Sequence, residues 1–141
     1  MKKHLIIVFW GFLLLPGLLS ALTTIQAARL FEKARMYETT GDLTRAEQFY
    51  DSLYTAYPHN SQYTSRYKSI LIRTGRLDKA LIITEQQFEN NPGNSNLAAE
   101  LGVLMMANNR KNDAYRLWEP LLRDRNMRNR IPQMAIMYLT A

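Results

Sequence analysis

The side chains that most often do chemistry in proteins are scarce in this 141-residue sequence. It has no cysteine and two histidines, so it lacks a thiol nucleophile and the cluster of nitrogen and sulfur ligands that zinc requires. His4 lies in an N-terminal basic head, and His59 follows Pro58 in an expected turn, where histidine is usually solvated. Glu85 and Glu89 recur at helical spacing, which is typical of a solvated helix face. We therefore expect a protein that is not an enzyme, with no catalytic residue, metal ligand or cofactor.

Basic side chains outnumber acidic ones by 18 to 12, for a formal net charge of +6. The one dense group comprises Arg123, Arg125, Arg128 and Arg130, with Asp124 among them. We interpret this group as a solvated loop after a helix end. The alternative is contact with anionic lipid headgroups or an acidic protein. Nucleic acid is the poorest choice, because no aromatic side chains are interleaved with the arginines to stack on bases.

The first residues have the parts of an export signal. The basic head Met1–His4 precedes the apolar run Leu5–Leu15, and Pro16-Gly17 breaks this run before Ser20-Ala21 supplies small residues. We expect residues 1–21 to be a secretory signal peptide that is cleaved after Ala21.

Two alternatives to that cleavage are open. Ala27 is a weaker cleavage candidate, and an uncleaved signal anchor would use the uncharged stretch Leu5–Leu22, which at roughly 18 residues reaches the lower limit for a membrane span. With Lys2 and Lys3 held in the cytoplasm, the rest of the chain is exported in either case. We expect a periplasmic or secreted protein, or one anchored to the inner membrane, and the lack of cysteine excludes a lipid-anchored lipoprotein.

Several residue types return at one fixed offset. Gly41, Leu43, Ala46 and Pro58 recur 34 residues later as Gly75, Leu77, Ala80 and Pro92, and Ala114 stands one further period on. A fixed period between about 20 and 50 residues marks an array of stacked supersecondary units. The period, together with the small–large pattern in the first unit, resembles the tetratricopeptide repeat (TPR), a helix-turn-helix unit. The pattern comprises Ala34, Tyr37, Gly41, Ala46, Tyr50 and Pro58.

This resemblance implies an all-α fold. The expected architecture is a right-handed TPR superhelix of three antiparallel helix pairs, plus a C-terminal capping or partial-repeat helix. The TPR domain would cover residues 22–141, with repeats at about 27–60, 61–94 and 95–128 and a last helix at about 130–140. Aromatic and methionine side chains at helix-packing positions are expected in the core, namely Tyr50, Tyr54, Tyr67, Met105 and Trp118.

Local signals predict where the helices begin and end. Gly41 is expected to end a first helix over 23–40 in the left-handed conformation, and Asn108-Asn109 stands where the first two repeats have Thr-Gly. Asp42 is expected to cap the second helix and Ser95 the fifth.

The third repeat departs from the pattern. Gly102 lowers helix propensity, and we expect it to let the partner helix approach closely. Pro120 should kink or shorten its helix. The last helix, Ile131–Thr140, is apolar nearly all round, although the end of a repeat array should be polar. A partner or a second copy would cover it, or the sequence is the N-terminal piece of a longer array.

The resemblance also implies that the first helices line a concave groove that binds peptide segments or helices of other proteins. The groove would be basic in its middle, so we expect a partner segment of acidic or carboxylate character. The clamp that some family members use for chaperone tails is not expected, because Phe31 and Glu100 occupy two of its positions. Carried over position by position, the groove comprises Phe31, Arg35, Glu38, Gln62, Ser65, Arg66, Ser69, Arg73, Asn96, Glu100, Val103 and Met106.

The hypothesis for function is therefore an exported scaffold or adaptor that mediates protein–protein interaction in the assembly of a bacterial envelope complex. Its partner would be a protein or peptide segment, with membrane contact only through a retained signal segment. The alternative is a structural or oligomerisation module that self-associates through the last helix, or the N-terminal part of a longer TPR protein with a further domain.

Overall fold

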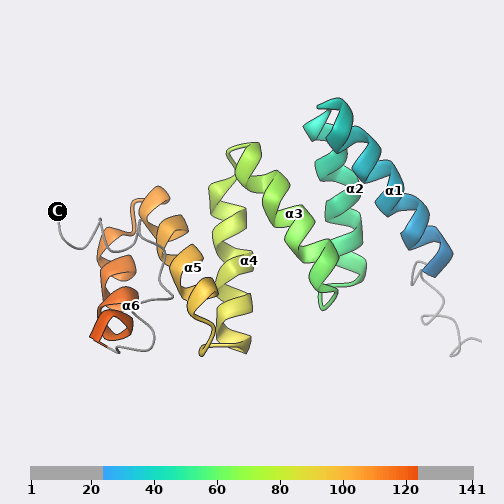
Figure 1. Ribbon diagram of the computed structural model, residues 1–141. Helices are drawn as coiled ribbons and strands as arrows, with labels where there is room; N and C mark the ends of the chain where they lie inside the picture. Colours follow the sequence, from blue (N-terminus) through green and yellow to red (C-terminus); the bar gives the residue numbers. More distant parts are fainter. Residues whose placement is uncertain (1–23, 124–141) are drawn as a thin grey trace, which may run out of the picture.

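The computed structural model describes residues 24–123, which form six α-helices and no strand (Figure 1). This confirms the all-α class. The expected signal segment, the arginines beyond Arg123 and the last helix lie outside the described residues. The helices are α1 (Thr24–Thr40), α2 (Leu43–Ala56), α3 (Ser61–Arg73), α4 (Leu77–Asn90), α5 (Ser95–Ala107) and α6 (Lys111–Arg123).

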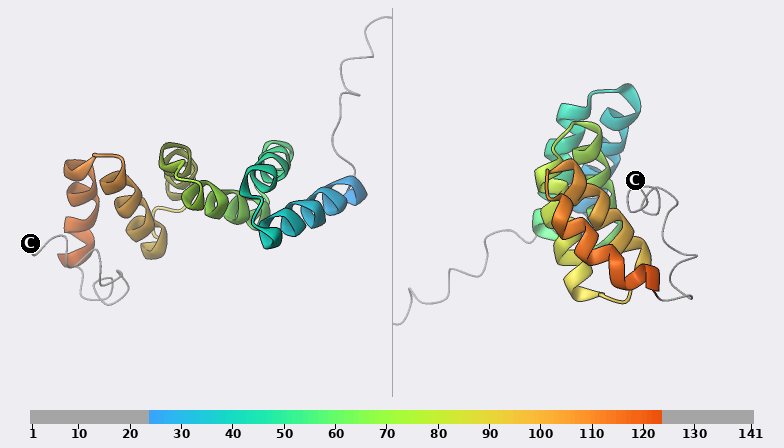
Figure 2. Two further views of the ribbon diagram at one scale, coloured as in Figure 1. Left: turned by 90° about the horizontal axis from the view of Figure 1, so that it is seen from above. Right: turned by 90° about the vertical axis from the view of Figure 1, so that its left-hand side faces the viewer.

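The helices alternate in direction along the chain. Helices α1, α3 and α5 run along one diagonal and α2, α4 and α6 run back, with α6 beyond α5 at the end of the array (Figure 1). Each helix packs mainly on its neighbours in the sequence. The resulting hairpins follow one another along a single axis (Figure 2). The described residues are therefore a helical-repeat array, in which each hairpin is stabilised chiefly by the hairpins beside it.

The turns inside the three hairpins use the left-handed conformation. Gly41 and Gly75 have φ of 84° and 75°, and Asn109 has φ of 61° in the corresponding turn of the third hairpin. Glycine has no Cβ to clash in this region, and asparagine tolerates it better than most residues. The predicted left-handed ends at Gly41 and at the Asn108-Asn109 pair are thus confirmed.

The helix caps confirm one prediction and correct another. The Asp42 carboxylate accepts a hydrogen bond from the backbone N–H of Arg45, as expected for the cap of α2. The cap of α5 is Asn94 and not Ser95, because the Asn94 side-chain oxygen accepts from two backbone N–H groups of the first turn. Ser95 is instead the first helical residue. Asn60 caps α3 in the same way, exactly one period earlier in the sequence.

Equivalent core positions recur in the first and third hairpins. In the first hairpin they hold Ala34 and Tyr50, and both are fully buried. In the third, a Cβ added to Gly102 would lie 2.0 Å from the indole of the buried Trp118, which confirms the predicted close approach. Tyr67 and Met105 are also buried as predicted, and Tyr54 is half-buried against the core.

Helix α6 contains a proline in its interior. The helix continues through Pro120 to Arg123, so of the two expected effects, a kink or a shortening, Pro120 does not end the helix. Pro120 cannot donate a hydrogen bond to the carbonyl four residues earlier, that of Arg116. Both residues lie on the exposed side of α6, where water can bond to that carbonyl instead.

Candidate partner-binding surface

Helices α1, α3 and α5 are joined by side-chain contacts, although they are not neighbours in the sequence. The ring of Phe31 on α1 lies 5.3 Å from that of Tyr63 on α3. The ammonium of Lys68 on α3 lies 2.9 Å from a carboxylate oxygen of Glu100 on α5. The three first helices therefore present one continuous face, which we call the first-helix surface. It comprises Arg35, Glu38, Gln62, Ser65, Arg66, Ser69, Ile72, Arg73, Asn96, Glu100, Val103 and Met106.

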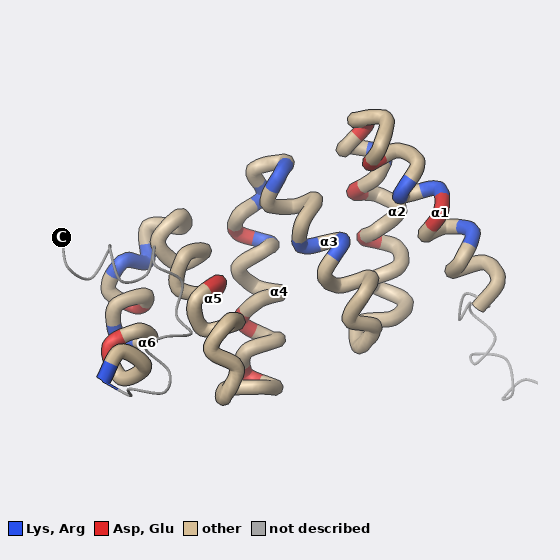
Figure 3. Tube along the Cα trace, viewed as in Figure 1, with Lys and Arg blue, Asp and Glu red and all other residues tan. Residues whose placement is uncertain are grey.

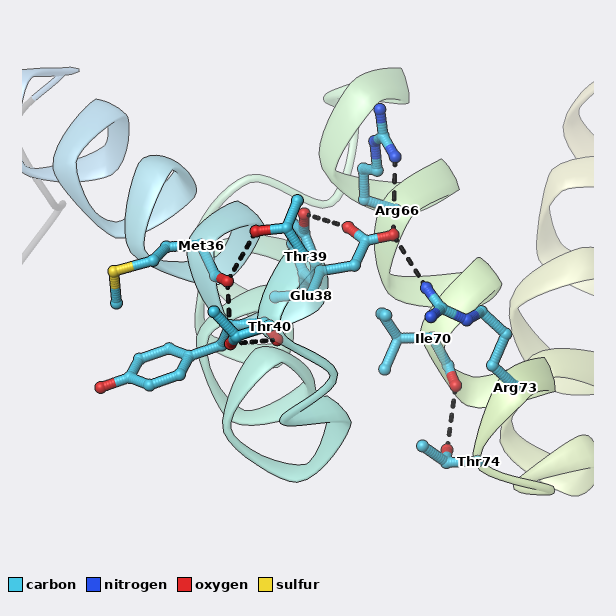
Figure 4. Close-up of polar contacts among 10 residues, drawn as sticks. Met36, Glu38, Thr39, Thr40, Arg66, Ile70, Arg73 and Thr74 are labelled. Atoms are coloured by element: carbon cyan, nitrogen blue, oxygen red, sulfur yellow. Dashed lines mark hydrogen bonds and ion pairs between the residues drawn. The ribbon is translucent and has the colours of Figure 1, made fainter.

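Two of the predicted groove arginines converge on one carboxylate (Figure 4). Glu38 on α1 lies 3.0 Å from Arg73 and 3.6 Å from Arg66, both on α3. The other oxygen of Glu38 accepts a hydrogen bond of 2.8 Å from the hydroxyl of Tyr50. Burial, and then the hydrogen bond to Glu38, raises the pKa of Tyr50, so this hydroxyl stays a donor. We call these four residues the Glu38 cluster.

The Glu38 cluster keeps a net positive charge, because two guanidinium groups share one carboxylate. The Glu38 side chain is 15% exposed, whereas those of Arg66 and Arg73 are 49% and 45% exposed. The carboxylate is thus held inside, and the guanidinium groups reach the solvent. The two arginines predicted for the middle of the groove are therefore exposed to the solvent, and Glu38 neutralises part of their charge.

A second charge pair joins α3 to α5. The Lys68 side chain is 10% exposed, and its ammonium contacts Gln87 at 2.8 Å and Glu100 at 2.9 Å. Lys68 occupies the repeat position that Ala34 and Gly102 occupy in the other two repeats, where both residues are small. Glu100, which was predicted to line the groove, forms an ion pair with Lys68 in the structure.

The remaining predicted groove residues divide by exposure. Phe31 does not belong to the surface: it is 9% exposed and packs edge-on against Tyr50 at 5.9 Å, so it is part of the core. Arg35 is exposed and pairs with Glu32 on its own helix at 3.2 Å. The exposed polar residues are Gln62, Ser65, Ser69 and Asn96, and the half-buried apolar ones are Val103 and Met106.

Charge is distributed unevenly among the helices (Figure 3). Helix α3 carries three basic side chains and no acidic one. Helix α4 carries Asp78, Glu85 and Glu89 against the single base Lys79. The basic character is therefore concentrated on the middle helix of the first-helix surface.

Within residues 24–123 no group of three or more histidines or carboxylates could hold a metal ion. In the same range no helix is long and apolar enough to cross a membrane. A scan against protein-family models found no match, and no curated protein resembles the chain significantly. Fold and surface together define a helical-repeat protein with a mixed basic and apolar face.

Proposed function

We propose that this chain is an exported TPR scaffold or adaptor that binds an acidic segment of a partner protein on its first-helix surface, as part of the assembly of a bacterial envelope complex. The TPR assignment is supported by the 34-residue period, the antiparallel hairpins and the left-handed turn inside each hairpin. In this arrangement the array is a right-handed superhelix, and the first-helix surface is its concave side.

The observation that carries the proposal is the exposure of Arg66 and Arg73 beside a half-buried carboxylate, that of Glu38. Each guanidinium has five N–H donors, and a carboxylate can take two of them side by side. Glu38 restrains both arginines from the core side and leaves their outer edges toward the solvent. Because the cluster is net positive, a second carboxylate is attracted to it.

The exposed polar residues of α3 extend this site along the helix. Gln62, Ser65 and Ser69 are exposed beside Arg66, and no carboxylate on α3 opposes an acidic ligand. Their amide and hydroxyl groups can bond to the backbone of a bound segment, whatever its sequence. The charge would then select acidic partners, and the neutral groups would hold the chain of the partner.

The test uses a random-peptide phage library as probe on the purified full-length chain. Enriched peptides should carry Asp or Glu, and their affinity should fall about tenfold or more on Arg66→Ala/Arg73→Ala, because charge-assisted hydrogen bonds are lost. The matched control is Arg45→Ala/Arg116→Ala, which removes the same charge from exposed sites on α2 and α6. Equal binding by both double variants would refute the proposed site, provided that circular dichroism shows both to be folded.

A further inference from the structure

The first-helix surface changes from charged to apolar along the array. Two of its positions recur in every repeat at the 34-residue period, and in each series the first member is charged and the last is apolar. The two series are Arg35, Ser69 and Val103, and Glu38, Ile72 and Met106.

The apolar end of this surface spans α3 and α5. Ile72 on α3 is 40% exposed, and it is one of four exposed large apolar side chains in residues 24–123. The Lys68–Glu100 pair fixes the two helices side by side, and Ile72 and Val103 each follow that pair by about one helical turn. Met106 continues the same stripe on α5, since residues three apart share a helix face. The exposed Ile72 and the half-buried Val103 and Met106 therefore belong to the same end of the first-helix surface.

We propose that the partner segment is bipartite, with carboxylates where it crosses α1 and α3 and apolar side chains where it crosses α3 and α5. This inference rests on the proposed function and specifies the chemistry of its partner. A segment that is acidic throughout would place carboxylates over Ile72 and Met106 and beside Glu100, where they are repelled and gain nothing. A segment that is apolar throughout would remove water from Arg66 and Arg73 without replacing their hydrogen bonds. Only a segment with both characters complements the whole surface.

The structure offers matched controls for the apolar half. The double variant Ile72→Ser/Met106→Gln changes this half. Its control, Ile82→Ser/Met36→Gln, makes the same chemical changes at Ile82 on α4, the second helix of a hairpin, and at Met36 on α1, the first helix of the array. Ile82 and Met36 are 54% and 51% exposed. Thermal unfolding by circular dichroism checks that each variant is folded. If Met106→Gln prevents folding, Ile72→Ser is tested alone against Ile82→Ser.

The probes are the peptides that the random library yields on the unmodified chain. We expect them to combine acidic and apolar residues, and we expect Ile72→Ser/Met106→Gln to weaken binding about fivefold or more while its control does not. Replacing the apolar residues of a peptide by alanine should then have little further effect on that variant. The acidic residues should couple in the same way to Arg66 and Arg73.

Three results would overturn the bipartite partner. If the apolar variant binds like the unmodified chain while Arg66→Ala/Arg73→Ala loses affinity, the acidic site stands and the apolar half fails. If neither variant changes binding, the proposed function fails as well. A labelled peptide of residues 131–140 serves as a second probe. If it competes with the library peptides for Ile72 and Met106, the apolar half binds a segment of this chain, and an external partner there is refuted.

Discussion

Replacing Gly102 by alanine should destabilise the third hairpin, although alanine is the better helix former. The substitution gains about 1 kcal/mol of helix propensity. Against this, the new Cβ would lie 2.0–2.3 Å from three atoms of the Trp118 indole, where about 3.5–4.0 Å is the favourable separation. Overpacking of this kind costs about 1–3 kcal/mol.

The indole cannot move away cheaply. Trp118 is fully buried, and its Nε1–H donates a hydrogen bond of 3.1 Å to the backbone carbonyl of Ala98. Moving the ring would leave that donor unsatisfied in the core, at a cost of about 1–3 kcal/mol. Together the two costs are about 2–6 kcal/mol, so with the propensity gain subtracted we expect Gly102→Ala to lower the free energy of unfolding by about 1–5 kcal/mol.

The first hairpin suggests the compensating change. It pairs Ala34 with Tyr50 at the positions that Gly102 and Trp118 occupy in the third, and both residues are fully buried there. The double variant Gly102→Ala/Trp118→Tyr should therefore be more stable than the sum of the two single effects by about 1 kcal/mol or more. Urea unfolding followed by circular dichroism measures all four forms. Additivity within about 0.5 kcal/mol would show that the two positions do not compete for space and would refute the reasoning.

Three other predictions concern the turns, a cap and the buried hydroxyls. Gly41→Ala should cost about 1–2 kcal/mol in urea unfolding because its φ is 84°, whereas Asn109→Gly should leave stability unchanged or raise it; the opposite order would contradict the turn geometry. Asn60→Ala should cost about 1 kcal/mol and speed amide exchange in the first turn of α3, and unchanged exchange would exclude the cap. Burial and carboxylate hydrogen bonds raise the pKa of Tyr50 and of Tyr67. The stabilisation from these two neutral hydroxyls should thus be complete below about pH 10 and decrease as the pH rises further. Part of the phenolate absorbance should therefore appear only when the protein unfolds, and this part should vanish in the variant Tyr50→Phe/Tyr67→Phe.

The helix ends could be predicted from the sequence because their causes are local. A left-handed residue after a helix depends on the residue type itself, so Gly41, Gly75 and the Asn108-Asn109 pair could be recognised within a few positions of the chain. The close approach at Gly102 was predictable for a similar reason, since a buried glycine at helical spacing has few other uses. The cap of α5 was predicted at Ser95, one position after the actual cap Asn94. Asn60, which caps α3 one period earlier in the sequence, indicates the correct position.

The charge pairs of the first-helix surface could not be predicted. Arg66, Arg73 and Lys68 are visible as basic residues in the sequence, but their partners lie on other helices, about 30 positions away. Which pairs form depends on how far each hairpin is rotated against the next, and packing of the core sets that rotation. The same dependence placed Phe31 in the core, although the family pattern assigned it to the groove.

These pairs also determine which part of the array a partner can disturb. At the junction of α1 and α3, Glu38 holds two half-exposed arginines, so an arriving carboxylate can compete with Glu38 for them. At the junction of α3 and α5, the Lys68 side chain is only 10% exposed and its ammonium already contacts Gln87 and Glu100, so it offers less to a ligand than Arg66 and Arg73 do. Competition would therefore weaken ion pairs only at the first junction, where the packing of α2 on α3 and of Phe31 on Tyr63 still holds the hairpins together.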